Sequence, residues 1–340
     1  MKRWKLGLLA GVLFSGLALA GCGSDGGGQP SEDGDAETKK ITMGYFPNLD
    51  HAPAIVGLKK DIFAKHLDGV EIKTEPFPDG NNFMDALNSG NLDIGYVGPG
   101  PAISRFMAGN DVVILASAAN GATLIVAREG SGIEQVADLS GKSFCTPGIG
   151  CTHDVQLEKM MLDIGLTTNR IGGDVIHQKQ PPATVEALFE SEQMDAAALP
   201  EPWGTYLVET ANASIIVEWD EVAWGETLPS VVLVSSKAFV EKNPELVKNF
   251  LKAHTEAIKF VNENRDDSIT AINDTLYELT QKRLPESVLT KSWERMKFTS
   301  EVHSEALQEW ADASYDLKFI QEPPKLDGLV DTTLIEEISK

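Results

Sequence analysis

The sequence is poor in positive charge. It holds 29 lysines and arginines against 51 aspartates and glutamates, a formal net charge of −22 over 340 residues. A chain this acidic lacks the basic surface that binds phosphate backbones, and anionic lipid headgroups repel it. We therefore expect neither nucleic acid binding nor electrostatic adhesion to a membrane, and we expect a monomer.

Long apolar runs are also scarce. The uncharged run from Leu6 to Gly21 follows three basic residues, and it is shorter than the ~20 residues of a spanning helix. This order is typical of a secretory signal. Leu19-Ala20-Gly21-Cys22 resembles the bacterial lipobox, which implies a signal peptide over residues 1–21 and lipidation of Cys22. An ordinary cleaved secretory signal is the alternative.

The segment after Cys22 lacks apolar side chains. Residues 23–38 contain five glycines and five acidic residues, with Ala36 as the one apolar side chain. Such a segment cannot bury enough surface to fold. We predict a flexible tether over residues 22–38 and a folded part from residue 39. Some 300 residues are long for one core, so two lobes are expected.

Strand and helix patterns then alternate twice. In the first unit we expect strands at 41–45, 70–73, 92–97 and 112–116, and in the second at 123–127, 142–145, 175–178 and 195–199. Strands separated by helices predict parallel sheets covered on both faces. Residues 231–235 are expected to return the chain to the first unit, followed by helices. The pattern predicts a first lobe of residues 39–122 and 235–330, and a second lobe of residues 123–234.

The two units share a short echo. Asp93 leads to Gly98-Pro99-Gly100-Pro101, and Asp195 leads to Leu199-Pro200-Glu201-Pro202. Each is a strand with an early aspartate and a proline-stiffened loop. Chance is the alternative explanation. As a repeat, the echo places one rigid loop at the carboxyl edge of each sheet, where open α/β sheets bind ligands.

Gly44-Tyr45-Phe46-Pro47, followed by His51-Ala52-Pro53-Ala54, resembles the N-terminal strand–loop–helix of solute-binding proteins of ABC importers. The resemblance is to the nitrate, sulfonate and taurine group, which also includes binders of a thiamine pyrimidine precursor. Segments 86–95 and 137–142 support it. Over residues 41–330 it implies an α/β, two-lobed periplasmic-binding-protein fold (type II-like), with mainly parallel sheets, a ligand cleft between the lobes and hinge closure. It implies no cofactor and no metal.

Loops at the carboxyl ends of the expected strands supply the candidate ligand-binding residues. Several are aromatic and suit a pocket wall, although core packing is the competing interpretation for each one alone. The set is Tyr45, Phe46, Asn48, Asn81, Gly98, Pro99 and Asn120 from the first lobe, and Gly148, Thr152, His153, Glu201, Trp203 and Trp224 from the second.

The segment from Thr146 to His153 is the strongest candidate for a ligand-binding loop. Gly148 and Gly150 allow backbone N–H groups to point inward, and Thr152 can open a helix whose N-terminus attracts anions. A plain strand-to-helix turn is the alternative, and His153 either donates to an anion or packs on the turn. No lysine or arginine lies in the strongest candidate loops, so a bound anion would depend on neutral donors.

Cysteine is scarce, with three in the chain. Cys145 and Cys151 bracket a glycine-containing loop and are a candidate disulfide, with two free buried thiols as the alternative. A metal role is weakly indicated, because Cys-x5-Cys-x-His lacks the two-cysteine hook of zinc sites. The chain shows neither a Gly-x-Ser-x-Gly elbow nor a P-loop. We expect that the protein is not an enzyme. The rival hypothesis is an enzyme on the same fold, with Cys151 as nucleophile and His153 as base.

The resemblance thus implies an extracytoplasmic solute-binding component, held on the cell membrane by a lipid. It would capture a small organic anion, such as an aliphatic sulfonate or taurine, and deliver it to a permease driven by an ATPase. Binding would shift an open–closed equilibrium. A thiamine pyrimidine precursor is the second candidate solute, and nitrate or bicarbonate the third. A lipid-anchored adhesin without a solute is the remaining alternative.

Overall fold

The strands divide between two sheets. A computed structural model of the chain describes residues 39–339; the predicted signal peptide, Cys22 and the tether to residue 38 lie outside the described residues. The first sheet has the order β11-β4-β10-β3-β1-β2 and the second the order β7-β6-β8-β5-β9. The first consists of β1 (Lys39–Tyr45), β2 (Val70–Pro76), β3 (Ile94–Val97), β4 (Val113–Gly121), β10 (Pro229–Ser235) and β11 (Met296–Lys297); the second consists of β5 (Thr123–Ala127), β6 (Ser143–Thr146), β7 (Ile176–Lys179), β8 (Ala196–Pro200) and β9 (Ser214–Val217).

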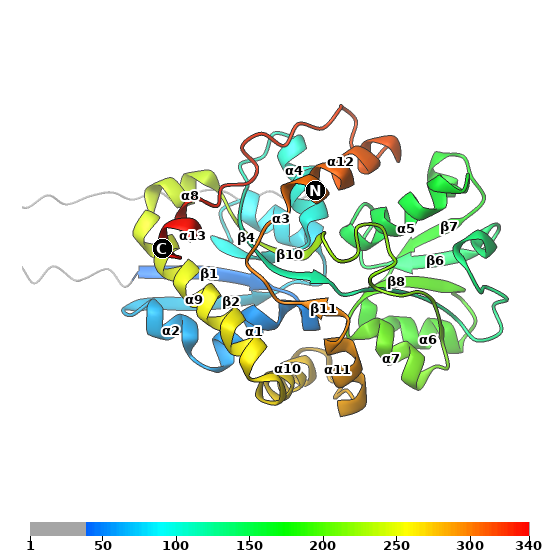
Figure 1. The fold of residues 1–340 in the computed structure, drawn as a ribbon, viewed down its shortest axis with the longest axis horizontal. Coiled ribbons are helices and arrows are strands. Elements are labelled where there is room, and N and C mark those ends of the chain that lie inside the picture. Colours follow the sequence, from blue (N-terminus) through cyan, green and yellow to red (C-terminus); the bar gives the residue numbers. More distant parts are fainter. Residues whose placement is uncertain (1–38, 340) are drawn as a thin grey trace, which may run out of the picture. The chain divides into compact units, whose positions relative to one another are not determined.

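Helices follow most of the strands, and further helices follow β10 (Figure 1). Those within the alternating part are α1 (Ala52–Lys59), α2 (Ile62–His66), α3 (Gly80–Asn88), α4 (Pro99–Met107), α5 (Thr152–Asp163), α6 (Val185–Glu190) and α7 (Trp203–Thr210), with short 3-10 turns such as η1 (Leu49–His51). Those after β10 are α8 (Lys237–Lys242), α9 (Pro244–Glu263), α10 (Arg265–Thr280), α11 (Glu286–Trp293), α12 (Ser304–Asp316) and α13 (Thr333–Ile338).

Every strand expected from the sequence is present, with bounds shifted by a few residues. β9 and β11 were not predicted, and β11 runs antiparallel to β4. Two of the predicted strands also differ in direction from the parallel expectation. β10 runs antiparallel to β3 and β4, and β5 runs antiparallel to β8 and β9. β5 and β10 are the first strands that the chain forms after it passes from one sheet to the other. The chain therefore runs through each of these two strands in the direction opposite to that of the neighbouring strands.

Apolar side chains cover both faces of the first sheet. On one face, Ile55 of α1 and Phe250 of α9 pack against Met43. On the other, Phe83 of α3 and Trp310 of α12 belong to a separate cluster with strand residues. Alternating strand residues thus face two different cores, as the twofold period of a strand requires.

The second sheet is covered in the same way. Leu157 on α5 belongs to the cluster that contains Phe144, whereas Cys145 faces the opposite cluster with Phe189 of α6 and Leu207 of α7. Figure 1 shows α5 on one side of the β6–β8 strands and α6 and α7 on the other. None of the helices within residues 39–339 combines the length and the apolar character that a membrane crossing needs.

Neither Asn48 nor Asp50 caps the first long helix. Asn48 precedes η1, Asp50 lies inside it, and α1 begins one residue after His51. The Asn48 Oδ1 atom instead accepts a hydrogen bond from the Trp203 indole at 3.0 Å. The 3-10 turn therefore turns these polar side chains away from capping.

The lobe boundaries stay predictions, but sheet membership changes at one residue. Ala122 separates β4 of the first sheet from β5 of the second, and it has a positive φ of 63°. The return crossing lies between Val217 and Pro229. Short crossings keep the carboxyl ends of strands from both sheets close together.

We predict that Gly100→Ala destabilises the protein. An added Cβ would lie 2.7 Å from the Trp310 ring and 2.9 Å from the backbone nitrogen of Thr152, so α4 must move away from α5. Overpacking of this kind costs about 1–3 kcal/mol, offset in part by the helix propensity of alanine. Urea unfolding would measure the loss.

Gly148→Ala is the matched control. Its added Cβ meets only the Cys151 Cβ, at 3.7 Å, so stability should stay within about 0.5 kcal/mol. Equal stability of Gly100→Ala and wild type would show that the α4–α5 contact is not tight.

Candidate functional site

A cavity of about 510 Å³ is enclosed by loops that follow strands of both sheets. These loops come after β1, β2 and β3 of the first sheet and after β6, β7 and β8 of the second. Open α/β sheets bind ligands at this edge. Of the thirteen predicted ligand-binding residues, eight line the cavity: Phe46, Asn48, Asn81, Gly98, Gly148, Thr152, His153 and Trp203.

The other five predicted residues do not line the cavity. Tyr45 packs in the core beneath β1, because strand alternation turns it away from the side that Phe46 faces. Pro99 is the buried first residue of α4. Asn120 is buried on β4 and accepts from Ser117 Oγ at 3.1 Å. Trp224 packs against the same cluster as Phe46. The fifth is Glu201.

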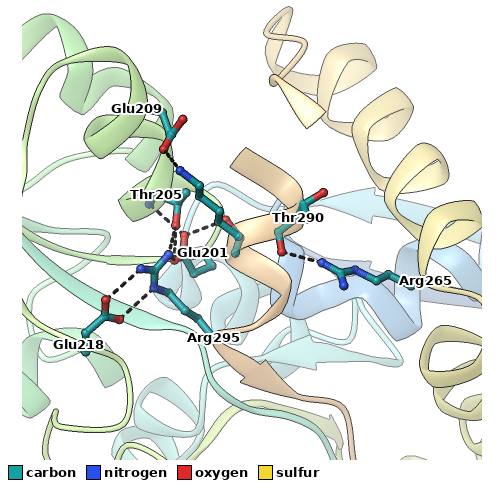
Figure 2. A network of polar contacts seen from close by, with 9 residues as sticks. Glu201, Thr205, Glu209, Glu218, Arg265, Thr290 and Arg295 are labelled. Atoms are coloured by element: carbon teal, nitrogen blue, oxygen red, sulfur yellow. Dashed lines mark hydrogen bonds and ion pairs between the residues drawn. The ribbon is translucent and has the colours of Figure 1, made fainter. Parts of the chain in front are cut away.

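The Glu201 carboxylate belongs to a buried polar network (Figure 2). It accepts hydrogen bonds from the Thr205 backbone at 3.0 Å, the Thr205 hydroxyl at 2.6 Å and Ser292 Oγ at 3.1 Å. Arg295 lies 3.7 Å away and also binds Glu218 through two bonds of 2.9 Å. Burial raises the pKa of Glu201. Its oxygens are occupied by the protein, so Glu201 has a structural role.

The N-terminus of α5 faces the cavity as predicted. Cys151 precedes the helix and its side chain makes no capping bond. The Gly150 N–H does not point at a ligand, contrary to expectation, because Asp154 Oδ2 accepts it at 2.6 Å. The donors left for a ligand are those of the first turn, beginning with Thr152 and His153. A helix start of this kind carries about half a positive charge.

His153 lines this cavity and has a buried side-chain atom without a partner. Its Nε2 is buried and bonded to no group within residues 39–339. Burial lowers the pKa of His153 to about 4, so the imidazole is neutral near pH 7. Burial also raises the pKa of the Cys151 thiol to about 12, and its Sγ lies 4.0 Å from His153 Nδ1. When the protonated thiol donates to Nδ1, the imidazole N–H is at Nε2 and can donate to a ligand.

His51 and Asn48 supply further neutral groups. His51 is buried at the cavity wall, and its Nδ1 accepts the Phe46 N–H at 3.4 Å, which leaves its own N–H at Nε2. Burial and the nearby His153 lower the pKa of His51 to about 3. The Asn48 amide accepts from Trp203, so the loop after β1 and the start of α7 are joined in the cavity wall.

Asp50 is a polar residue of the cavity wall that the sequence analysis missed. Its Oδ1 is buried without a partner, and burial, strengthened by the charge of Glu201, raises its pKa to about 8. The carboxyl is therefore mostly protonated near pH 7 and does not repel an anion. Its position in the sequence could have indicated this role, because Asp50 stands between Asn48 and His51 in a loop that supplies candidate ligand-binding residues.

No lysine or arginine lines the cavity in the described part of the chain. The other acidic residue of the wall, Asp79, caps α3 by accepting from Asn81 N–H at 2.9 Å, and it pairs with Lys179 of β7 at 2.7 Å. The prediction that a ligand would meet neutral donors agrees with this wall.

Cys145 and Cys151 are free. Cys145 points into the core on the α6–α7 side of the second sheet, and Cys151 precedes α5 on the other side. Strand geometry therefore separates the thiols, and the alternative of two free thiols is the one the structure has. Among the described residues, the side chains close enough to share a metal ion are instead Asp154, Glu158 and His177.

Part of the wall comes from the C-terminal region and was not predicted. Leu279 and Thr280 end α10, and Phe319 follows α12. Their place depends on how distant helices pack, and no local pattern indicates it. Ser230 enters from β10 for the same reason.

We predict that Asp50→Asn stabilises the protein, increasingly so between pH 5 and 8. Wild type must keep a proton on Asp50 up to about pH 8, whereas the unfolded chain ionises near pH 4. Wild type therefore loses up to about 1.4 kcal/mol per pH unit across this window. Asparagine has no such cost.

Urea unfolding at pH 5 and pH 8 checks this prediction. Asp68→Asn, at an exposed position before β2, controls for the removal of one carboxyl. An Asp50→Asn gain that is the same at both pH values would contradict a raised pKa.

Solved structures share this architecture. The alkanesulfonate-binding protein SsuA from Xanthomonas axonopodis pv. citri, bound to MOPS, superimposes with a TM-score of 0.74 at 21% identity, over 87% of this chain and 99% of that one. The periplasmic nitrate-binding protein NrtA from Synechocystis PCC 6803 gives 0.72 at 16% identity, over 89% of each chain. The predicted periplasmic-binding-protein fold is confirmed.

Sequence relatives point the same way. A Bacillus subtilis (strain 168) protein, provisionally named an aliphatic sulfonates-binding protein, is 28% identical over 99% of this chain and 97% of its own. The taurine-binding periplasmic protein of Escherichia coli (strain K12) is 28% identical over 65% of this chain and 66% of its own. The model of the NMT1-like family matches residues 34–273. This chain belongs to the NMT1-like family.

Proposed function

We propose that the protein is the solute-binding component of an ABC import system and that it captures a small organic anion of the aliphatic sulfonate class. The observation that carries this proposal is the uncapped start of α5 in the cavity wall, where His153 also has a buried Nε2 atom without a partner among the described residues. A sulfonate presents three oxygens that accept hydrogen bonds, and it needs donors rather than a counter-charge at a helix N-terminus. The names of the sulfonate- and taurine-binding relatives support the class.

The apolar part of the wall suits the carbon chain of such a solute. Phe46, Phe77, Trp203 and Phe319 line the cavity together with several prolines. Binding pockets commonly combine an apolar lining with a few placed polar groups. The same aromatic rings favour a flat heteroaromatic solute, so a thiamine pyrimidine precursor is the second candidate.

Capture needs no chemistry. The pKa of Cys151, raised to about 12, makes a thiolate nucleophile unfavourable at neutral pH, and the pKa of His153, lowered to about 4, makes it a weak base. We infer that the solute leaves unaltered and passes to a membrane permease with its ATPase.

We predict that ethanesulfonate and taurine bind the chain from Thr38 onward, and that His153→Ala weakens this binding about 10- to 100-fold. The loss corresponds to one hydrogen bond to a charged group. Isothermal titration calorimetry measures the affinity, and mass spectrometry of the recovered solute checks that it is unchanged.

His303→Ala is the matched control, because His303 lies outside the cavity. Nitrate, bicarbonate and a hydroxymethylpyrimidine complete the panel. Binding of the pyrimidine with no response to either sulfonate would replace the proposed solute class, and a chemically altered solute would replace binding by catalysis.

We further propose that Cys22 anchors the protein to the outer face of the cell membrane. The Leu19-Ala20-Gly21-Cys22 sequence supports it, as does the acidic, glycine-rich segment that follows. One acyl chain holds a protein only marginally, whereas two or three hold it stably. An anchor would keep the capture domain near its permease.

Cys22→Ala is expected to abolish fatty-acid labelling and to move the protein from the detergent phase to the aqueous phase in Triton X-114 partition. Cys145→Ala, which removes another cysteine, should leave both unchanged. Labelling that survives Cys22→Ala would contradict the anchor.

A further inference from the structure

A second cluster of polar side chains lies buried behind the loop that lines the cavity. Asp154 and Glu158 stand one turn apart on α5, and His177 lies on β7. The His177 Nδ1 atom is 3.4 Å from Asp154 Oδ1 and 4.0 Å from Glu158 Oε1. The three atoms lie within 4.8 Å of one another, and all three side chains are at least 97% buried.

Each carboxylate has one oxygen held by the protein and one that is not. Asp154 Oδ2 accepts the Gly150 N–H at 2.6 Å, and Glu158 Oε2 accepts from Arg170 at 2.9 Å and Thr168 at 3.4 Å. The inner oxygens, Asp154 Oδ1 and Glu158 Oε1, are buried without a partner among the described residues. Both face His177.

The imidazole is held in the same way. The Thr146 hydroxyl lies 3.1 Å from the Gly148 carbonyl and 2.7 Å from His177 Nε2; when it donates to the carbonyl, it accepts from Nε2. The Nδ1 atom of the neutral ring then carries a lone pair. Phe144 stacks on the ring at 4.5 Å and fixes its plane.

Three hydrogen-bond acceptor atoms therefore face one another in the protein interior. A cation or a proton between them would stabilise this arrangement. We propose that Asp154, Glu158 and His177 bind one divalent transition metal ion, of which zinc is the type. Around a tetrahedral ion with bonds of about 2.0–2.1 Å, ligand atoms lie roughly 3.3–3.5 Å apart. The 3.4 Å distance already fits; the 4.0 Å distance, and the separation of the two carboxylate oxygens within 4.8 Å, would have to shorten by side-chain movement.

The surroundings match those of metal ligands. Zinc-bound histidines donate their other N–H, and ligating carboxylates are themselves hydrogen-bonded; Thr146, Gly150 and Arg170 make these bonds here. Of the two carboxylates, the Arg170 guanidinium pairs with Glu158 alone, so a bound cation would offset the charge of Asp154 when that carboxyl ionises. An imidazole nitrogen among the ligands favours zinc over magnesium. A proton shared among Asp154, Glu158 and His177 is the alternative to the metal ion.

This proposal is independent of the solute. Because Asp154 would join the ion to the Gly150 N–H, the ion would also hold the loop that contributes Gly148 and Cys151 to the cavity. The metal site and the cavity are thus neighbours on the two sides of one loop.

The test uses the untagged full chain, stripped with a chelator and titrated with ZnCl₂, with MgCl₂ as comparison. We expect one equivalent of zinc by mass spectrometry of the metal content and a raised melting temperature. His177→Gln and Glu158→Gln should each weaken zinc binding at least about 10-fold. His66→Gln is the matched control, because His66 pairs with Glu256 at the surface.

X-ray absorption at the zinc edge of wild type keeps the test decisive even where a variant fails to fold. One imidazole with oxygen ligands supports the site. Sulfur scattering, or two imidazoles, would place the ion at Cys151 or at His51 and His153 and would overturn the proposal. So would the absence of zinc uptake, which would leave a proton shared within the cluster.

Discussion

The cavity depends on one buried residue that ties three segments together. The Glu201 backbone N–H donates to Ala122 at the crossing between the sheets, and its carbonyl accepts from Leu49 after β1. Its carboxylate binds the start of α7 and Ser292 of α11, with Arg295 beside it. A buried carboxylate is tolerated only when such bonds replace its water. Because breaking these bonds would leave the carboxylate buried without partners, they keep the loops of both sheets together at one edge. The shared cavity forms between these loops.

The sequence predicts this architecture well where local patterns carry it. The echo between the two units is real in structural terms: Asp93 Oδ2 accepts the Thr42 N–H at 2.7 Å, and Asp195 Oδ2 accepts the Ser143 N–H at 3.0 Å. Each aspartate stands before a strand and fixes the neighbouring strand of its own sheet. Strand order and cavity loops follow from such repeats. A period of two also explains why Phe46 reaches the cavity and Tyr45 does not.

What the sequence does not reveal is set by contacts between distant segments. The antiparallel directions of β5 and β10 depend on where the chain crosses, and Phe319 reaches the wall because α12 packs on α4 and α5. The position of its loop after β8 predicts Glu201 as a ligand residue. Its side chain turns into the protein because Thr205, Ser292 and Arg295 are there to receive it, and two of those partners lie some ninety residues further along the chain.

A neutral cavity in an acidic protein constrains what it can capture. The net charge of −22 repels anions at a distance, but at physiological salt this repulsion is screened beyond about 8 Å. Inside, the attraction comes from a helix N-terminus and imidazole N–H groups rather than from a lysine or arginine of the wall. Fixed dipoles can replace the hydration of a single, delocalised negative charge, whereas a dianion loses more hydration than such dipoles return. For the solute proposed above, such a wall suits a monoanion better than a dianion, and the apolar residues beside the donors suit its carbon chain.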